Sequence, residues 1–113
     1  MSPQQKSELA NHALALQREG RVDLAEAAWK TLLQADPGDA RALAMLGLIA
    51  AGKGDTAGAI GLLGASLQRD PGNVPMRFNL ALLHRQAGDL DNALAGFDRV
   101  LAQRPGEARV LPH

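Results

Sequence analysis

The chain repeats its pattern of residue types every 34 residues. Pro37, Pro71 and Pro105 stand 34 residues apart, twice in succession, and the residues between them recur in kind. A sequence that restarts at such an interval encodes a repeated supersecondary unit, and each unit needs a neighbouring copy to bury its apolar side. The repeat therefore predicts a solenoid and makes macromolecular binding the leading expectation for function.

The composition predicts an all-α interior. Of the 113 residues, 46% are hydrophobic, mostly alanine and leucine, and the aromatic residues are only Trp29, Phe78 and Phe97. Alanine and leucine favour helices, whereas strands are rich in β-branched and aromatic residues. A chain of this length can bury about two-thirds of its unfolded surface in one domain. We expect a single domain of closely packed helices, over residues 1–113, without strands.

Charge and cysteine content argue against several classes of function. Twelve basic residues balance twelve acidic ones, and no stretch gathers like charges into a block, so nucleic acid is not an expected partner. The chain has no cysteine, which removes disulfides, thiol catalysis and cysteine-based zinc sites. No signal-peptide pattern follows Met1, and no run approaches about 18 uninterrupted apolar residues. We expect a cytoplasmic protein with no membrane contact.

Three units follow from the repeat: residues 6–39, 40–73 and 74–107. Within each unit, apolar residues recur at spacings of three and four, then a glycine interrupts, then a second helical spacing begins. Each unit should therefore be a helix, a short turn, a second helix and a turn containing proline. The first stripe is Leu9/Leu43/Arg77, His12/Leu46/Leu80, Ala13/Gly47/Ala81 and Leu16/Ala50/His84; the shared glycines are Gly20, Gly54 and Gly88; the second stripe is Ala25/Ala59/Ala93, Trp29/Leu63/Phe97 and Leu32/Ser66/Val100.

Helix-capping residues stand where these helices should begin. Ser2 precedes Pro3, and Gln5 can complete a capping box with it. Asp39 and Asn73 can cap the first helices of units two and three, and Asp55 and Asp89 their second helices. Proline has no amide hydrogen, so Pro37, Pro71 and Pro105 should each follow a helix end, while Pro75 fits a first turn.

These motifs resemble the tetratricopeptide repeat (TPR) family over residues 6–107. Unit two has Leu43, Leu46-Gly47, Ala59, Leu63 and Pro71 at the family's positions. The resemblance implies a right-handed α-solenoid of stacked antiparallel helix pairs, with six helices and the start of a seventh, and places Trp29 and Phe97 in the core. Departures are Arg77 and His12 at apolar places, Ala50 and His84 where tyrosine is usual, and Leu32, Ser66 and Val100 where alanine is usual.

The resemblance also implies where a partner would bind. In this family the first helix of each hairpin faces the concave side of the solenoid, so its outward residues should line a groove. An apolar groove with a few polar groups suits an extended peptide or a helix, since methionine adapts and phenylalanine anchors. The main expected groove residues are Asn11, Leu14, Arg18, Arg41, Met45, Leu48, Phe78, Asn79, Leu82 and Arg85, and Ser7, Ala10, Gln17, Ala44, Ala51 and Gln86 should line the groove with them.

Two binding modes of the family can be compared with this chain. In some members asparagines at equivalent places form a ladder that pairs with a peptide backbone; here Asn11 and Asn79 match, and Met45 interrupts the ladder. The alternative for both is a solvated helix face. Other members hold a carboxylate with lysine, asparagine and arginine, but the matching places carry no positive charge, which disfavours that ligand.

Other candidate sites are weak. Gly52-Lys53-Gly54-Asp55-Thr56 lacks the order of a phosphate loop, and the three histidines occupy unrelated places, so we expect no cofactor, no metal and no catalytic residues. Gly58, Gly61 and Gly64 stand three apart in the second helix of unit two. These glycines mark either a place where another chain approaches closely or neutral sequence change in a helix that its neighbouring helices stabilise.

The sequence therefore predicts a noncatalytic protein–protein interaction module that binds a peptide segment or a helix. Residues 108–113 begin a fourth unit, so the C-terminal end should lack a polar cap. This leaves two alternatives. The chain is an accessory TPR region of a larger bacterial enzyme of transferase or hydroxylase type, with its catalytic domain beyond His113, or it assembles into a homo-oligomer through the uncapped end.

Overall fold

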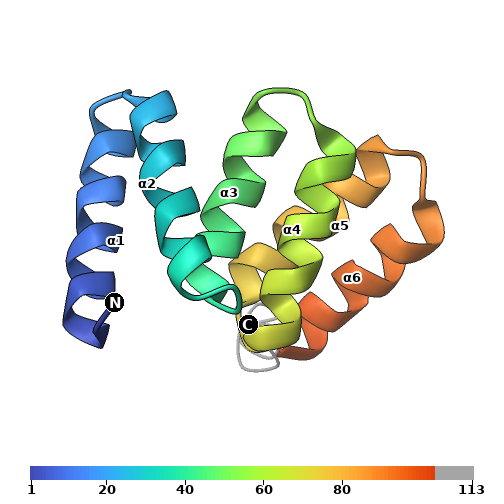
Figure 1. Ribbon diagram of the computed structural model, residues 1–113. Helices are drawn as coiled ribbons and strands as arrows, with labels where there is room; N and C mark the ends of the chain where they lie inside the picture. Colours follow the sequence, from blue (N-terminus) through green and yellow to red (C-terminus); the bar gives the residue numbers. More distant parts are fainter. Residues whose placement is uncertain (104–113) are drawn as a thin grey trace, which may run out of the picture.

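The computed structural model describes residues 1–103, and this part contains six helices and no strand (Figure 1). Successive helices run antiparallel, and each packs against the next along the chain. The prediction of an all-α fold built from stacked helix pairs is confirmed; Pro105 and the expected start of a seventh helix lie outside the described residues. The helices are α1 (Pro3–Arg18), α2 (Val22–Ala35), α3 (Ala40–Gly52), α4 (Thr56–Arg69), α5 (Val74–Gln86) and α6 (Leu90–Gln103).

The predicted caps set the helix starts. Ser2 accepts a hydrogen bond from the Gln5 amide while its own amide donates to the Gln5 side chain, which completes the capping box. Asp39, Asp55, Asn73 and Asp89 each accept from the amide three residues ahead, while α2 begins after Arg21 without a side-chain cap. Because each cap satisfies an amide that the helix leaves unpaired, the five predicted starts are fixed locally.

A glycine with positive φ joins the two helices of every hairpin. Gly20, Gly54 and Gly88 have φ values of 79°, 84° and 82°, and they are the only residues with positive φ in the described part. This region favours glycine because other residues place Cβ too close to the backbone. The repeated turn therefore needs glycine at this one place, as the shared spacing predicted.

Each interface between hairpins is filled by apolar side chains. Between the first and second hairpins, Trp29 and Leu32 are fully buried together with Ala42, Leu46 and Ile49 of α3. Between the second and third, Ala44, Ala59 and Leu63 pack with Leu83 of α5. Each hairpin therefore covers the apolar flank of its neighbour, which is the arrangement expected of a repeat solenoid.

The stack is elongated. Its principal extents are 45 × 29 × 26 Å and its radius of gyration is 15.3 Å, compared with about 13 Å for a compact domain of this length. The core is a series of interfaces between neighbouring hairpins and has no single centre. Among the first helices, α1 has the most exposed residues, whereas only Arg41 and Gly52 are exposed on α3.

The two ends of the described stack differ in polarity. Ala42 and Leu46 are buried against the preceding hairpin, but the equivalent residues of α1 are Glu8 and His12, which are exposed. At the other end Leu101 is 64% exposed, whereas its equivalent Leu67 is 6% exposed beneath the next hairpin. The N-terminal end is thus closed by polar side chains, and the α5–α6 end is apolar.

Phe97 shows the same end effect. Trp29, at the equivalent place, is completely buried, so the core prediction is confirmed there. Phe97 is only partly buried because no further hairpin covers it among the described residues. Its ring meets Phe78 edge to face, with centroids 5.7 Å apart, and Phe78 is itself 44% exposed.

Replacing Gly61 or Gly64 of α4 by alanine should stabilise the fold. A Cβ atom at either position would meet no other atom within 4 Å, so the substitution adds no clash. Each should raise the free energy of unfolding by about 0.5–1 kcal/mol, since interior glycine costs that much relative to alanine. Urea denaturation would measure the gain. Gly54→Ala is the control and should destabilise, because its φ of 84° strains any residue with a Cβ.

Candidate functional site

The predicted groove residues all lie on α1, α3 and α5, the first helices of the three hairpins. We call these ten residues the groove surface. Five are exposed and five are partly buried, so every member retains some surface that a partner can reach. The exposed members are Asn11, Arg18, Arg41, Phe78 and Arg85, and the partly buried ones are Leu14, Met45, Leu48, Asn79 and Leu82.

Leucines at one repeat position form the apolar part of this surface. Leu14, Leu48 and Leu82 are separated by 34 residues, so they occupy the same place on α1, α3 and α5. Leu14 borders a hollow of about 450 Å³ with Gln17 and Arg18. Leu48 borders a second hollow of about 310 Å³ that Gln17 also lines, so these two leucines face adjoining depressions.

Gln17 lines the hollows beside Leu14 and Leu48, and its side chain has a structural role that was not predicted from the sequence. Its Oε1 accepts a hydrogen bond from Nε1 of the fully buried Trp29, at 2.7 Å. A buried tryptophan N–H needs an acceptor, so this bond fixes Gln17 against the core. The requirement for an acceptor was readable from the sequence, but which residue supplies it depends on how α1 packs on α2.

Asn79 and Phe78 lie at the apolar end of the groove surface. Together with Val74, Pro75 and Val100 they line a hollow of about 340 Å³. The Asn79 amide lies 4.0 Å from the sulfur of Met76 and is partly buried, whereas Asn11 is exposed on α1. The two asparagines therefore share a repeat position but not an environment.

Ala10 and Ala44 were expected to line the groove, and this prediction was wrong. They are 0% and 2% exposed. Ala10 packs in the first interface with Ala42 and Leu46, and Ala44 packs in the second with Leu63 and Leu83. This repeat position is turned toward the following hairpin, which also explains why Phe78, with no following hairpin described, is exposed.

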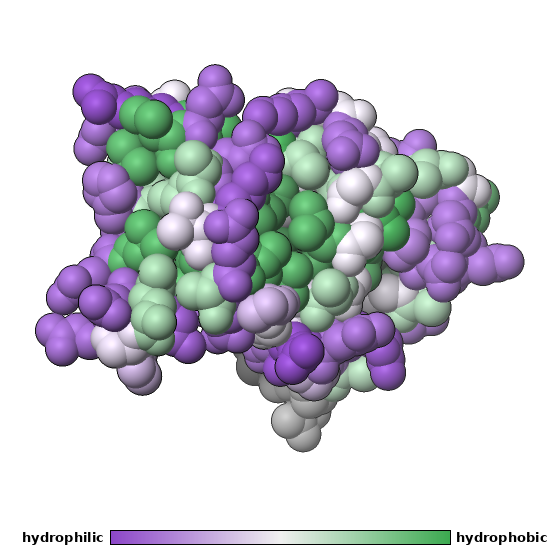
Figure 2. Space-filling view, viewed as in Figure 1, coloured by the Kyte–Doolittle hydropathy of each residue, from purple (hydrophilic) through white to green (hydrophobic). Residues whose placement is uncertain are grey.

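On the side shown in Figure 2, apolar surface lies in two areas, at the left and over the middle of the molecule, and a run of hydrophilic side chains separates them. Residues 1–103 hold no group of three or more histidine, cysteine or acidic side chains arranged to bind a metal. Across the same span, none of the helices reaches the length and hydropathy needed to cross a bilayer. What the described surface offers is therefore apolar area with scattered polar groups.

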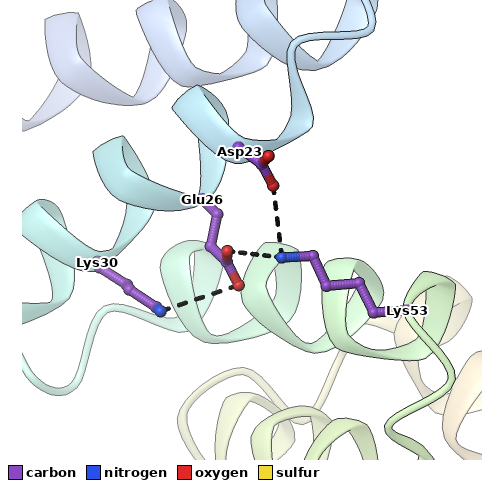
Figure 3. A network of polar contacts seen from close by, with 4 residues as sticks. All are labelled: Asp23, Glu26, Lys30 and Lys53. Atoms are coloured by element: carbon purple, nitrogen blue, oxygen red, sulfur yellow. Dashed lines mark hydrogen bonds and ion pairs between the residues drawn. The ribbon is translucent and has the colours of Figure 1, made fainter.

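An ion-pair network joins the first hairpin to the second beside the Leu48 hollow. Lys53, which lines that hollow, places its Nζ 2.8 Å from Oε1 of Glu26 and 3.6 Å from Oδ1 of Asp23 (Figure 3). Lys30 approaches the other Glu26 oxygen at 3.9 Å. The hydrogen bond from Lys53 is the main cause that lowers the pKa of Glu26, and the same bond raises the pKa of Lys53.

Removing the Lys53 ammonium should raise the pKa of Glu26. In Lys53→Met the carboxylate loses its main hydrogen-bond donor, so its pKa should move up toward the ordinary value of 4.5. Lys30→Met is the control and should move it less, because Lys30 acts only through its charge. Carboxyl-carbon NMR titration would measure both. An unchanged Glu26 pKa in Lys53→Met would show that the network does not form in solution.

The same network gives stability a defined pH dependence. Because the pKa of Glu26 is lowered on folding, its contribution is present above its ordinary pKa and is lost as the pH falls through the folded value. The Lys53→Met variant should therefore lose less stability than the parent chain over that acidic range. Thermal melts recorded across the range would show the difference.

Comparisons with known proteins agree with this geometry. Two family models described as tetratricopeptide repeat match residues 11–74 and 48–111. No curated protein matches the chain. Among solved structures, a mutant O-GlcNAc transferase of Thermobaculum terrenum is 30% identical with a TM-score of 0.81, and the match covers 88% of this chain but 19% of the transferase. This chain therefore spans about a fifth of that enzyme's length.

Two bacterial chaperone structures match over more of their length. PcrH of Pseudomonas aeruginosa, in complex with the chaperone binding region of PopB, is 26% identical with a TM-score of 0.81; the match covers 91% of this chain and 83% of PcrH. The type III secretion translocator chaperone SycD of Yersinia enterocolitica is 22% identical with a TM-score of 0.82, and the match covers 94% of this chain and 75% of SycD. With its repeated hairpins and the two matching family models, this chain belongs to the tetratricopeptide repeat family.

Proposed function

We propose that the chain is a noncatalytic protein–protein interaction module that binds a peptide segment or a helix on the groove surface. The row of Leu14, Leu48 and Leu82 carries this proposal, because three apolar side chains at one repeat position give a strip that crosses all three first helices. A partner lying across the strip buries apolar area on each hairpin in turn.

Met45 supports the same proposal. It is partly buried and packs against both interface clusters, so its side chain lies where the first and second interfaces meet the surface. Methionine is flexible and polarisable and can fit side chains of different shapes. PcrH, which shares this fold, has been solved with the chaperone binding region of a partner protein, which further supports a peptide ligand. Transferase activity is not carried over, because the match covers 19% of that enzyme.

Placing two carboxylates on the groove surface, at Met45 and Leu48, should weaken peptide binding. Short random peptides displayed on phage would be selected on the parent chain, and the affinity of one enriched peptide measured by fluorescence anisotropy. The Met45→Glu/Leu48→Glu double variant should bind it at least about tenfold more weakly, about 1.4 kcal/mol, because the partner would have to desolvate both charges.

Leu24→Glu is the matched control for this experiment. Leu24 is 54% exposed and lies on α2, outside the groove surface, so its substitution should leave the affinity unchanged. Circular dichroism would verify that each variant keeps its helices. Full affinity in the folded double variant would show that the groove surface is not the binding site.

Self-association through the α5–α6 end is a second candidate. Phe78, Leu94 and Leu101 are 44%, 62% and 64% exposed there, and apolar residues gathered at one end favour contact with a second copy. The contact would pair two α5–α6 ends, because head-to-tail stacking would bury Glu8 and His12 of α1. Such a contact is isologous and closes at a dimer.

Analytical ultracentrifugation tests this candidate directly. The parent chain should show a mass that rises from monomer toward dimer with concentration, and Leu94→Glu/Leu101→Glu should stay monomeric. The Leu24→Glu variant provides the control for a charge placed elsewhere. A parent chain that remains monomeric at high concentration would contradict self-association and would leave the peptide-binding proposal unaffected.

A further inference from the structure

The net charge of the chain is zero, but in the fold acidic and basic residues are distributed unevenly between the first helices and the rest of each hairpin. Among the described residues, α3 and α5 contain no acidic residue, and the acidic residues other than Glu8 lie in turns or on second helices. The side that the first helices form is therefore basic. Its charged residues are Lys6, Arg18, Arg41, Arg77 and Arg85, against the single acid Glu8.

Three of these basic residues belong to the groove surface and have no acidic partner. Arg18, Arg41 and Arg85 are exposed, and within residues 1–103 none has a carboxylate within 4.0 Å. The other two are already engaged. Lys6 pairs with Asp36 at 3.1 Å, and Arg77 donates to the carbonyl of Pro71 at 3.0 Å. On the first helices, the exposed arginines with neither a carboxylate partner nor a hydrogen bond from the side chain therefore all belong to the groove surface.

The three arginines border the leucine row on both edges. Arg18 and Arg85 lie in the last turns of α1 and α5, and Arg41 is the second residue of α3. Because the first helices run in the same direction, Arg18 and Arg85 stand at one edge of the surface and Arg41 at the opposite edge. Leu14, Leu48 and Met45 lie between these edges.

We propose that the groove surface selects peptide segments in which apolar residues are flanked by aspartate or glutamate. This inference rests on the proposed peptide-binding function and adds the partner's charge to it. An uncompensated guanidinium attracts a carboxylate and can bind it through two parallel hydrogen bonds, whereas it repels a basic segment. Opposite charges set the choice of partner, while the leucine row supplies the buried apolar area.

A charge-reversal experiment tests the inference. Random peptides displayed on phage would be selected in parallel on the parent chain and on an Arg18→Glu/Arg41→Glu/Arg85→Glu variant. The parent should enrich acidic residues beside apolar ones, and the reversed variant should enrich lysine and arginine instead. A peptide enriched by the parent should bind the reversed variant at least about tenfold more weakly, and its affinity for the parent should fall between 0.1 and 1 M NaCl, over which the Debye length shortens from about 10 to 3 Å.

Two controls separate this inference from the function on which it rests. Arg21→Glu/Arg69→Glu/Arg99→Glu changes the net charge equally, at residues that belong to none of the first helices, and it should keep the acidic preference. A second outcome would overturn the charge inference alone. In it, the selected peptides lose affinity for the Met45→Glu/Leu48→Glu variant, but neither the parent nor the reversed chain enriches acidic residues; peptide binding on the groove surface would then be retained. Failure of the parent chain to select any peptide that depends on Met45 and Leu48 would overturn both.

Discussion

Burial of one hairpin's apolar flank by the next is the constraint on which the rest of the structure depends. Trp29 and Leu32 are shielded from water by residues of α3, and Leu63 by residues of α5, so no hairpin completes its own core. A stack of this kind is held together by contacts between neighbours, and its stability is approximately a sum of unit and interface contributions. Since the interfaces occupy the flanks of each hairpin, the outward sides of α1, α3 and α5 are left available for binding.

Polar contacts add to the apolar packing, both within a hairpin and between neighbouring hairpins. Lys53 bridges the turn after α3 to two acidic residues of α2, and the Trp29–Gln17 hydrogen bond joins α2 to α1. In the third hairpin, Arg77 and Gln103 both donate to the carbonyl of Pro71, which joins α5 and α6 to the turn before them. Gln17 and Lys53 both line the hollow beside Leu48, so two of these contacts hold residues at the border of the groove surface.

The local features of the fold could be predicted from the sequence, and the features set by the stack could not. Caps such as Asp39 and the positive-φ glycines depend on residues a few places apart, so spacing alone located them. The burial of Ala10 and Ala44 depends on which side of a helix meets the next hairpin, and Phe97 is only partly buried because no hairpin follows α6 within residues 1–103. The basic side of the first helices was also missed, since residues far apart in the sequence supply its charge. The ten residues of the groove surface lie on the three first helices, as the repeat indicated, and their role in binding stays a prediction.

The unequal ends of the stack bear on how such a chain changes during evolution. Duplication of a hairpin-coding segment lengthens a repeat protein only where the new copy finds a surface that it can cover. Ahead of α1, a new hairpin would meet the carboxylate of Glu8 and the imidazole of His12, which it would have to strip of water. Beyond α6 it would meet Leu94 and Leu101, which already have the character of an interior. An added hairpin would therefore find an apolar surface to cover at the α6 flank of the described stack and a polar one at the α1 flank.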